Sequence, residues 1–309
     1  MSRDALACII LAHTDPPHLK RLIAALAPFP VYLHVDSRTP RTQFAQMVAA
    51  LPDRCVLLDR IATGWARFEN VEAEINGYRT ALAGSDAPHI ALFTGSDYPL
   101  ASTLEITQVL SRLRGLSIVQ NFPLPHPYWG QNGGFSRLRY RHWAVRKRML
   151  RLPIPRRLPR GMILAGGSQL KVLARDHAQA VVTAYDHNPA LVSFWRRSWV
   201  ADETFVPSIL ASSRFVPDWE TEHIHAGLWW IGWEPSRSKS PPWLTAERQA
   251  AVLSRRTDPE QAMDHLFARK FSTAQSTDLL NLIDVTLRVP AVGDATPPPS
   301  LAGRARGKD

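Results

Sequence analysis

Two adjacent carboxylates, Asp202 and Glu203, form the part of this sequence best suited to acid–base chemistry. They open a helix predicted over 203–211. Acidic side chains at a helix N-terminus stabilise the helix by about 0.3–1 kcal/mol, so a structural role alone explains their presence. We interpret Asp202 as the helix cap, which leaves Glu203 free to take a proton from a reacting hydroxyl.

A cation pair, Arg269-Lys270, offers a second kind of chemistry. It stands between Phe267 and Phe271. A solvated basic pair is the simpler interpretation. Cations held between aromatic side chains instead indicate a fixed anion site, because ammonium and guanidinium groups bind phosphate oxygens strongly.

Polar residues also follow three apolar runs: His13, Asp36 and the segment 94–100, Thr-Gly-Ser-Asp-Tyr-Pro-Leu, which contains Asp97. Asp36 either caps the next turn or accepts hydrogen bonds from a ribose or a base. Glycine in the 94–100 segment lets a ligand approach the backbone. We expect Asp97 to be functional.

The elements that must position these residues alternate over the first 120 residues. Apolar runs predict strands at 6–12, 31–35, 56–58, 89–94 and 116–119. Amphipathic patterns predict helices at 15–26, 41–51, 68–82 and 103–113, the first with Asp15 as N-cap and Pro16 at the first helical position. Such alternation indicates an α/β fold with a doubly wound, mainly parallel sheet flanked by helices. Ligands of such sheets bind beyond the carboxyl ends of the strands.

The rest of the chain is less regular. The segment 121–167 is rich in Pro, Gly, aromatic and basic residues; helices are predicted at 170–185, 203–211 and 279–287, and a strand at 228–233. We predict a single domain over 1–289, with a nucleotide-binding half (1–120) and an acceptor or catalytic half (121–289). The tail, 290–309, is predicted to be disordered.

Composition and charge narrow the function. The 309 residues carry a net charge of +10, and residues 135–160 hold ten Lys and Arg with no Asp or Glu. This favours an anionic partner: a nucleotide phosphate, nucleic acid, a membrane surface or an acidic glycan. No apolar stretch reaches the roughly 18 residues of a transmembrane helix, and the N-terminus lacks signal-peptide features. Only Cys8 and Cys55 are present, which argues against a disulfide scaffold. We therefore expect a cytoplasmic protein.

Several catalytic signatures are missing. The sequence has no glycine-rich dinucleotide fingerprint, no phosphate-binding loop ending in Gly-Lys-Ser/Thr and no Gly-x-Ser-x-Gly elbow. No two aspartates are separated by one residue, and no histidine pair has metal-binding helical spacing. We expect neither a metal nor another cofactor.

Five motifs, in order, resemble the core-2/I-branching N-acetylglucosaminyltransferases and the related peptide O-xylosyltransferases, which form glycosyltransferase family 14. The resemblance runs over 7–271. It rests on Ile-Ile-Leu-Ala-His (9–13), His-Val-Asp (34–36), Gly-Ser-Asp-Tyr-Pro-Leu (95–100), Asp-Glu-Thr-Phe (202–205) and Phe-Ala-Arg-Lys-Phe (267–271). Trp65 also matches, but Ala66-Arg67 replaces the usual glycine pair. Leu170 follows Gly-Ser-Gln where the family commonly has Trp, which leaves the sugar and acceptor open.

The resemblance implies an inverting, metal-independent transferase of GT-A fold that uses a UDP-sugar and a glycan acceptor. UDP-GlcNAc is the preferred donor, with UDP-xylose as the alternative. Glu203 matches the general base, and Lys270 with Arg269 would stabilise the departing UDP. The other candidate donor or acceptor contacts are His13 and Asp36 (uridine), Asp97 and Trp65 (sugar and acceptor), Ser168 and Asp202, and Arg237 or Arg248 (a second diphosphate-binding Arg).

Two other hypotheses come from different classes. Residues 135–160, with Tyr140 and Trp143 among the cations, suit a non-catalytic module that binds nucleic acid or an anionic membrane. Such a module gains nothing from Glu203, so we prefer the enzyme, with no nucleic-acid partner. The basic segment would then face the acceptor or make peripheral contact with the inner membrane. An epimerase is disfavoured because the glycine-rich cofactor loop is missing.

Overall fold

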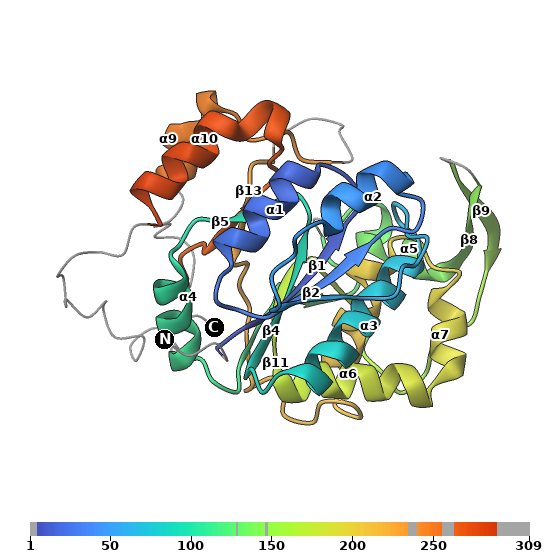
Figure 1. Ribbon diagram of the computed structural model, residues 1–309. Coiled ribbons are helices and arrows are strands. Elements are labelled where there is room, and N and C mark those ends of the chain that lie inside the picture. Colours follow the sequence, from blue (N-terminus) through green and yellow to red (C-terminus); the bar gives the residue numbers. More distant parts are fainter. Residues whose placement is uncertain (1–4, 128, 146–147, 234–239, 255–262, 289–309) are drawn as a thin grey trace.

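The computed structural model describes residues 5–288, except 128, 146–147, 234–239 and 255–262. Its centre is a seven-stranded sheet of order β12-β6-β11-β4-β1-β2-β3. Its strands are Ala7–Ala12 (β1), Val31–Val35 (β2), Cys55–Leu57 (β3), His89–Thr94 (β4), Ser117–Ile118 (β6), Lys171–Ala174 (β11) and His223–Ile224 (β12). Strands β11, β4, β1 and β2 are labelled at the centre of Figure 1. Only β11 runs antiparallel to its neighbours. The predicted mainly parallel α/β architecture, consistent with a GT-A-like fold, is confirmed.

Both faces of the sheet are buried, which explains why its central strands are apolar throughout. In β1, Cys8 and Ile10 pack into one core, while Ala7 and Ile9 pack into the other. The first core is covered by Pro16–Ala25 (α1), Arg41–Val48 (α2), Thr103–Arg112 (α4), Gln249–Ser254 (α9) and Thr273–Thr286 (α10). The second is covered by Glu69–Gly84 (α3), Arg175–His187 (α6), Pro189–Trp195 (α7) and Phe205–Leu210 (α8).

Three small sheets complete the fold. Strand Phe267–Arg269 (β14) pairs with Asp97–Pro99 (β5) on one side and Trp229–Ile231 (β13) on the other. This sheet brings two of the sequence motifs side by side. The others are Asn121–Pro123 (β7) with Ala165–Gly167 (β10), and a hairpin of Tyr140–Val145 (β8) and Arg148–Pro155 (β9). The remaining short elements are helix Ser136–Arg139 (α5) and the 3-10 turns Gln131–Gly134 (η1), Ala201–Glu203 (η2) and Ala246–Arg248 (η3).

Most predicted elements of the first 120 residues lie within a few residues of their observed bounds. Asp15 caps α1, as predicted, by accepting a hydrogen bond from the backbone N–H of His18. The helix predicted over 170–185 is partly wrong, because its first residues form the buried strand β11. The irregular segment 121–167 was not predicted to hold strands, yet it supplies both hairpin strands, β7 and β10. The predicted tail, 290–309, lies outside the described residues.

Two further sequence expectations concern the cysteines and the membrane. Cys8 and Cys55 are both free thiols. Within the described ranges, no helix has the length and apolarity needed to cross a bilayer.

Candidate active site

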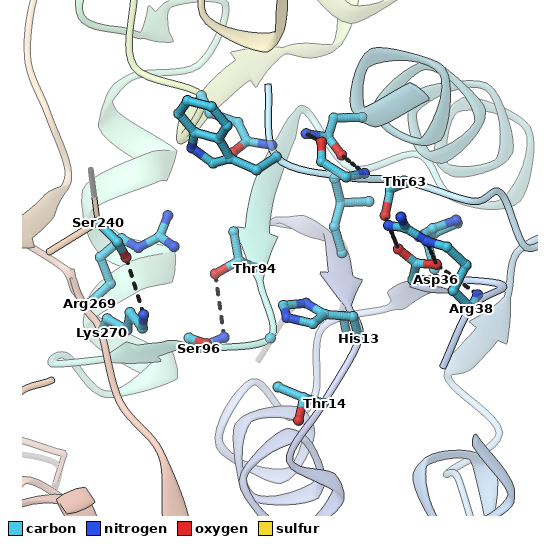
Figure 2. A pocket seen from close by; sticks show the side chains of 18 of the residues that line it. His13, Thr14, Asp36, Arg38, Thr63, Thr94, Ser96, Ser240, Arg269 and Lys270 are labelled. Carbon is cyan, nitrogen blue, oxygen red and sulfur yellow. Dashed lines mark hydrogen bonds and ion pairs between the residues drawn. The ribbon is translucent and has the colours of Figure 1, made fainter. Parts of the chain in front are cut away.

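A cavity of about 450 Å³ lies where β1, β2 and β4 end (Figure 2). These strands are parallel, so the residues that follow them, His13, Asp36 and Gly95, meet at one edge of the sheet. The opposite wall comes from the segment after β14, which contributes Lys270. The cavity is thus built from residues that lie more than 250 positions apart in the chain.

Asp36 lines this cavity and also holds its rim together. Its two carboxylate oxygens accept hydrogen bonds from the backbone N–H and the guanidinium of Arg38 and, at 2.7 Å, from the hydroxyl of Thr63. Burial acts to raise the pKa of Asp36, but these hydrogen bonds outweigh it and hold the pKa below its usual value. Asp36 therefore caps the turn after β2 and also lines the cavity, while its binding of a ribose or a base stays a prediction.

His13 stands at the end of β1 beside Asp36. Burial lowers the pKa of His13, and nearby Lys270 and Arg38 lower it further, against the opposing effect of Asp36. A lowered pKa favours the neutral imidazole near pH 7, which can donate one hydrogen bond and accept another.

Lys270 faces His13 across the cavity. Its ammonium lies 4.0 Å from the ring centre of Trp243 and donates to the hydroxyl of Ser240 at 3.2 Å. Burial and the neighbouring Arg269 lower the pKa of Lys270. The prediction that Phe267 and Phe271 hold the cations is wrong, because both rings are buried in the core. The aromatic ring beneath the Lys270 ammonium belongs to Trp243.

Asp97 supports the site from beneath and does not line the cavity. It is fully buried, and its oxygens accept hydrogen bonds from the backbone and hydroxyl of Thr94 and from the indole of Trp229. It also forms an ion pair with Arg269 at 3.5 Å, its register partner in the pairing of β5 with β14. Asp97 therefore balances the charge of Arg269, which does line the cavity.

Glu203 lies outside the cavity lining and is paired with Arg137 at 2.5 Å. The Arg137 guanidinium stacks over Trp129 at 3.9 Å and faces Trp199 at 5.7 Å. Burial and the adjacent Asp202 raise the pKa of Glu203, while Arg137 opposes that rise. Glu203 is about one-third exposed, so its carboxylate is accessible from solvent.

Asp202 is not the helix cap that we predicted. The turn η2 begins after Val200, and Asp202 is buried within it. One Asp202 oxygen accepts a hydrogen bond at 3.2 Å from Asn70, which also bonds both backbone groups of Gly64. Since Asn70 and Gly64 line the cavity, this network ties the Asp202–Glu203 turn to the cavity wall.

Trp65 connects the two regions. It lines the cavity, is more than half exposed and meets Trp199 edge-on at 6.2 Å. Because Trp199 also faces the Arg137 that holds Glu203, an aromatic surface runs from the cavity to the carboxylate.

Two other predicted contacts, Ser168 and Arg248, are not among the residues that line the cavity. The hydroxyl of Ser168 accepts a hydrogen bond from the backbone N–H of Leu170, and its neighbour Gln169 lines the cavity instead. Arg248 is the last residue of the turn η3. Arg237 lies outside the described residues.

Sequence reasoning missed several site residues: Arg38, Thr63, Asn70, Gln169, Trp243 and Arg137. Arg38 follows the His-Val-Asp motif by two positions, and Gln169 belongs to the Gly-Ser-Gln motif, so proximity to a motif was an available signal. Arg137 and Trp243 lie in irregular segments that gave no such signal.

No three His, Cys, Asp or Glu side chains in the described part of the chain gather as a metal site would require. The positively charged side chains that line the cavity include those of Arg38, Arg269 and Lys270.

The sequence is similar to a known protein family. The family model described as "Core-2/I-Branching enzyme" matches residues 6–254. Human beta-1,3-galactosyl-O-glycosyl-glycoprotein beta-1,6-N-acetylglucosaminyltransferase 3 is 23% identical, over 93% of this chain and 69% of its own. Human xylosyltransferase 2 is also 23% identical, over 87% of this chain but only 32% of its own length. The family match covers most of the chain, and both relatives are glycosyltransferases by name; the chain belongs to the Core-2/I-branching enzyme family and is a glycosyltransferase.

Proposed function

We propose that this protein transfers a sugar from a UDP-sugar to a hydroxyl of a glycan, with inversion at the anomeric carbon and without a divalent metal. The observation that carries this proposal is how the charged and polar side chains are distributed around the cavity. His13 and Asp36 stand at the strand ends on one side, and Arg269 and Lys270 stand on the other. A nucleoside end and a diphosphate end of one donor suit these two sides.

The departing UDP needs positive charge where its β-phosphate develops negative charge. Lys270, held in the cavity by Trp243 and Ser240, and Arg269, fixed by the buried Asp97, would supply that charge. Cations fixed before the reaction stabilise developing charge without reorganising, which is the condition for large catalytic effects. The pair can therefore do the work that a metal does in enzymes with an Asp-x-Asp motif.

Glu203 is the proposed general base. It would take the proton of the acceptor hydroxyl as that oxygen attacks the anomeric carbon and the bond to UDP breaks. The Trp65–Trp199 surface leads from the cavity to Glu203, and aromatic faces of this kind suit the apolar faces of sugar rings. We therefore place the acceptor sugar along this surface.

The donor sugar follows the names of the two relatives. One is an N-acetylglucosaminyltransferase and the other a xylosyltransferase, so UDP-GlcNAc is the proposed donor and UDP-xylose the alternative. Measuring UDP release from UDP-GlcNAc, UDP-xylose, UDP-glucose and UDP-galactose decides between them. Release from none of the four, under conditions where the protein is folded, would contradict the proposal.

Glu203→Gln tests the base directly. The substitution keeps the side chain's shape but removes its capacity to accept a proton, and general-base catalysis contributes about 10²–10⁴-fold to a rate. We expect kcat to fall by that order while the dissociation constant for UDP, measured by calorimetry, stays unchanged. Glu220→Gln makes the same chemical change at an exposed position and should turn over normally. Normal turnover by Glu203→Gln would remove Glu203 from this role.

Peripheral contact of residues 135–160 with an anionic membrane is a second part of the proposal. Ten basic residues without an acid make this segment attractive to anionic lipid.

A further inference from the structure

A second cavity, of about 770 Å³, opens between the β8–β9 hairpin and α7. The hairpin stands at the edge of the molecule, next to α7 and on the side opposite α4 (Figure 1). The lining of the second cavity combines two kinds of side chain: the guanidinium groups of Arg141, Arg156, Arg157 and Arg197, and the aliphatic chains of Leu152 and Ile154.

The charge of this cavity is not neutralised by its own lining, which contains no acidic residue in the described part of the chain. Arg156 shows this best. Among the described residues, its guanidinium donates to three neutral acceptors, the backbone carbonyls of Leu138 and Phe194 and the hydroxyl of Ser198. Burial, with a smaller effect of Arg141, lowers the pKa of Arg156 to about 10. The cavity is thus a positively charged hollow that suits an anion.

The same hairpin exposes large aliphatic side chains. Leu150, Leu152 and Ile154, at alternate positions of β9, are 54%, 38% and 63% exposed. Exposed aliphatic residues cost free energy in water, and the arginines beside them favour a partner that is apolar in one part and anionic in another. Aliphatic tips beside a basic hollow instead match the boundary between lipid headgroups and acyl chains.

We propose that the β8–β9 hairpin and α7 form a docking surface for an anionic phospholipid bilayer. A headgroup phosphate would lie in the second cavity against Arg141, Arg157 and Arg197, while Leu150 and Ile154 enter the acyl boundary. Arg156 is held by its three hydrogen bonds and supplies fixed positive charge beneath the phosphate. This inference rests on the membrane contact in the proposed function and gives that contact a site.

Backbone contacts link this surface to the candidate active site. Arg197 accepts a hydrogen bond through its carbonyl from the backbone N–H of His142 in the hairpin. Two residues later, Trp199 donates through its backbone N–H to Arg137 and packs against Trp65 of the first cavity. A bilayer on the hairpin would therefore lie beside the aromatic surface proposed for the acceptor.

Flotation of the full chain with lipid vesicles tests the proposal. Vesicles of phosphatidylcholine with about one-third phosphatidylglycerol should carry the protein, and vesicles of phosphatidylcholine alone should not; added salt should release it. Arg141→Gln/Arg157→Gln should weaken binding by roughly 25-fold, since each basic residue near such a surface contributes about fivefold. Leu150→Ser/Ile154→Ser should also weaken it. Arg112→Gln/Arg114→Gln removes the same charge at exposed positions near the end of α4 and should bind normally.

Donor turnover in solution separates this inference from the proposed function, because UDP release from a soluble assay requires no vesicle. All the surface variants should keep wild-type UDP release. Equal binding to both kinds of vesicle, or equal losses in the hairpin and α4 variants, would overturn the docking surface. Normal vesicle binding by Arg141→Gln/Arg157→Gln with a raised KM for a glycan acceptor would also overturn it and make the hollow an acceptor site.

Discussion

The pairing of Glu203 with Arg137 changes what a base at this position must do. Partial burial and the adjacent Asp202 raise the pKa of Glu203, and Arg137 is the charge that opposes this rise. The Arg137 guanidinium is itself held over the ring of Trp129, which fixes the position of the charge that pairs with Glu203. If Glu203 is the proposed base, Arg137 is a positioning residue that holds its carboxylate and favours the ionised form.

Removing this positive charge should shift the pH dependence of the reaction. A base works only when deprotonated, so kcat/KM falls as pH drops through its pKa. Without Arg137 the pKa of Glu203 rises, and in Arg137→Gln the acidic limb of the kcat/KM profile should move to higher pH. Arg137→Lys should restore part of the shift. Arg139→Gln, an exposed change on the same helix, is the control, and superimposable profiles for Arg137→Gln and Arg139→Gln would contradict this role.

For single residues, the sequence predicts which ones lie at the cavity better than it predicts which side chains contact them. His13 and Asp36 could be placed because each directly follows an apolar strand, and strand ends meet at one edge. The partners of Glu203 and Lys270 could not be found, since Arg137 and Trp243 are brought in by segments without periodicity. Only packing in three dimensions joins Arg137 to a residue 66 positions away.

Among the elements, β11 departs most from its sequence pattern. Its Lys171 is fully buried and pairs with Glu74 of α3 at 2.8 Å, and Tyr78 donates to the same carboxylate oxygen. The helix-like periodicity over 170–185 includes the residues of β11, so the sequence predicts a helix where this buried strand forms. The buried pair joins the only antiparallel strand of the sheet to α3, whose first turn carries Asn70.

Breaking this pair should destabilise the whole fold. Glu74→Gln leaves the Lys171 ammonium buried without a counter-charge, and such changes cost about 3–5 kcal/mol in the free energy of unfolding. Glu72→Gln, two residues away, removes the surface pair with Arg196 and should cost less than about 1 kcal/mol. Urea unfolding of the two variants measures both effects. A loss for Glu74→Gln no larger than that for Glu72→Gln would show that the buried pair does not hold β11 to α3.

For the molecule as a whole, the sequence predicts the architecture because the first 120 residues alternate strands and helices, and both sheet faces are buried. It could not predict how the last 160 residues complete that sheet. Strands β11 and β12 come from the second half, and β14 crosses back to pair with β5 beside the cavity. These are short, non-local pairings whose partners no local pattern identifies.

The two sides of the cavity therefore depend on one long-range contact, the pairing of β14 with β5. This pairing sets Arg269 and Lys270 opposite His13 and Asp36. If these cations replace a metal, catalysis must depend on them and not on divalent ions. Lys270→Ala should then lower turnover by on the order of 10²–10³-fold and weaken UDP binding, by analogy with the loss of one fixed charge-stabilising group. Lys20→Ala, an exposed change on α1, is the matched control.

The most direct measurement is the initial rate of UDP release from the preferred UDP-sugar in excess EDTA, repeated after Mg²⁺ or Mn²⁺ is added back. The proposed mechanism predicts that the wild type and Lys20→Ala keep their full rate in EDTA, that added metal changes neither, and that Lys270→Ala is slow under every condition. A wild-type rate abolished by EDTA and restored by metal would contradict the mechanism and return the role of Lys270 to a divalent ion.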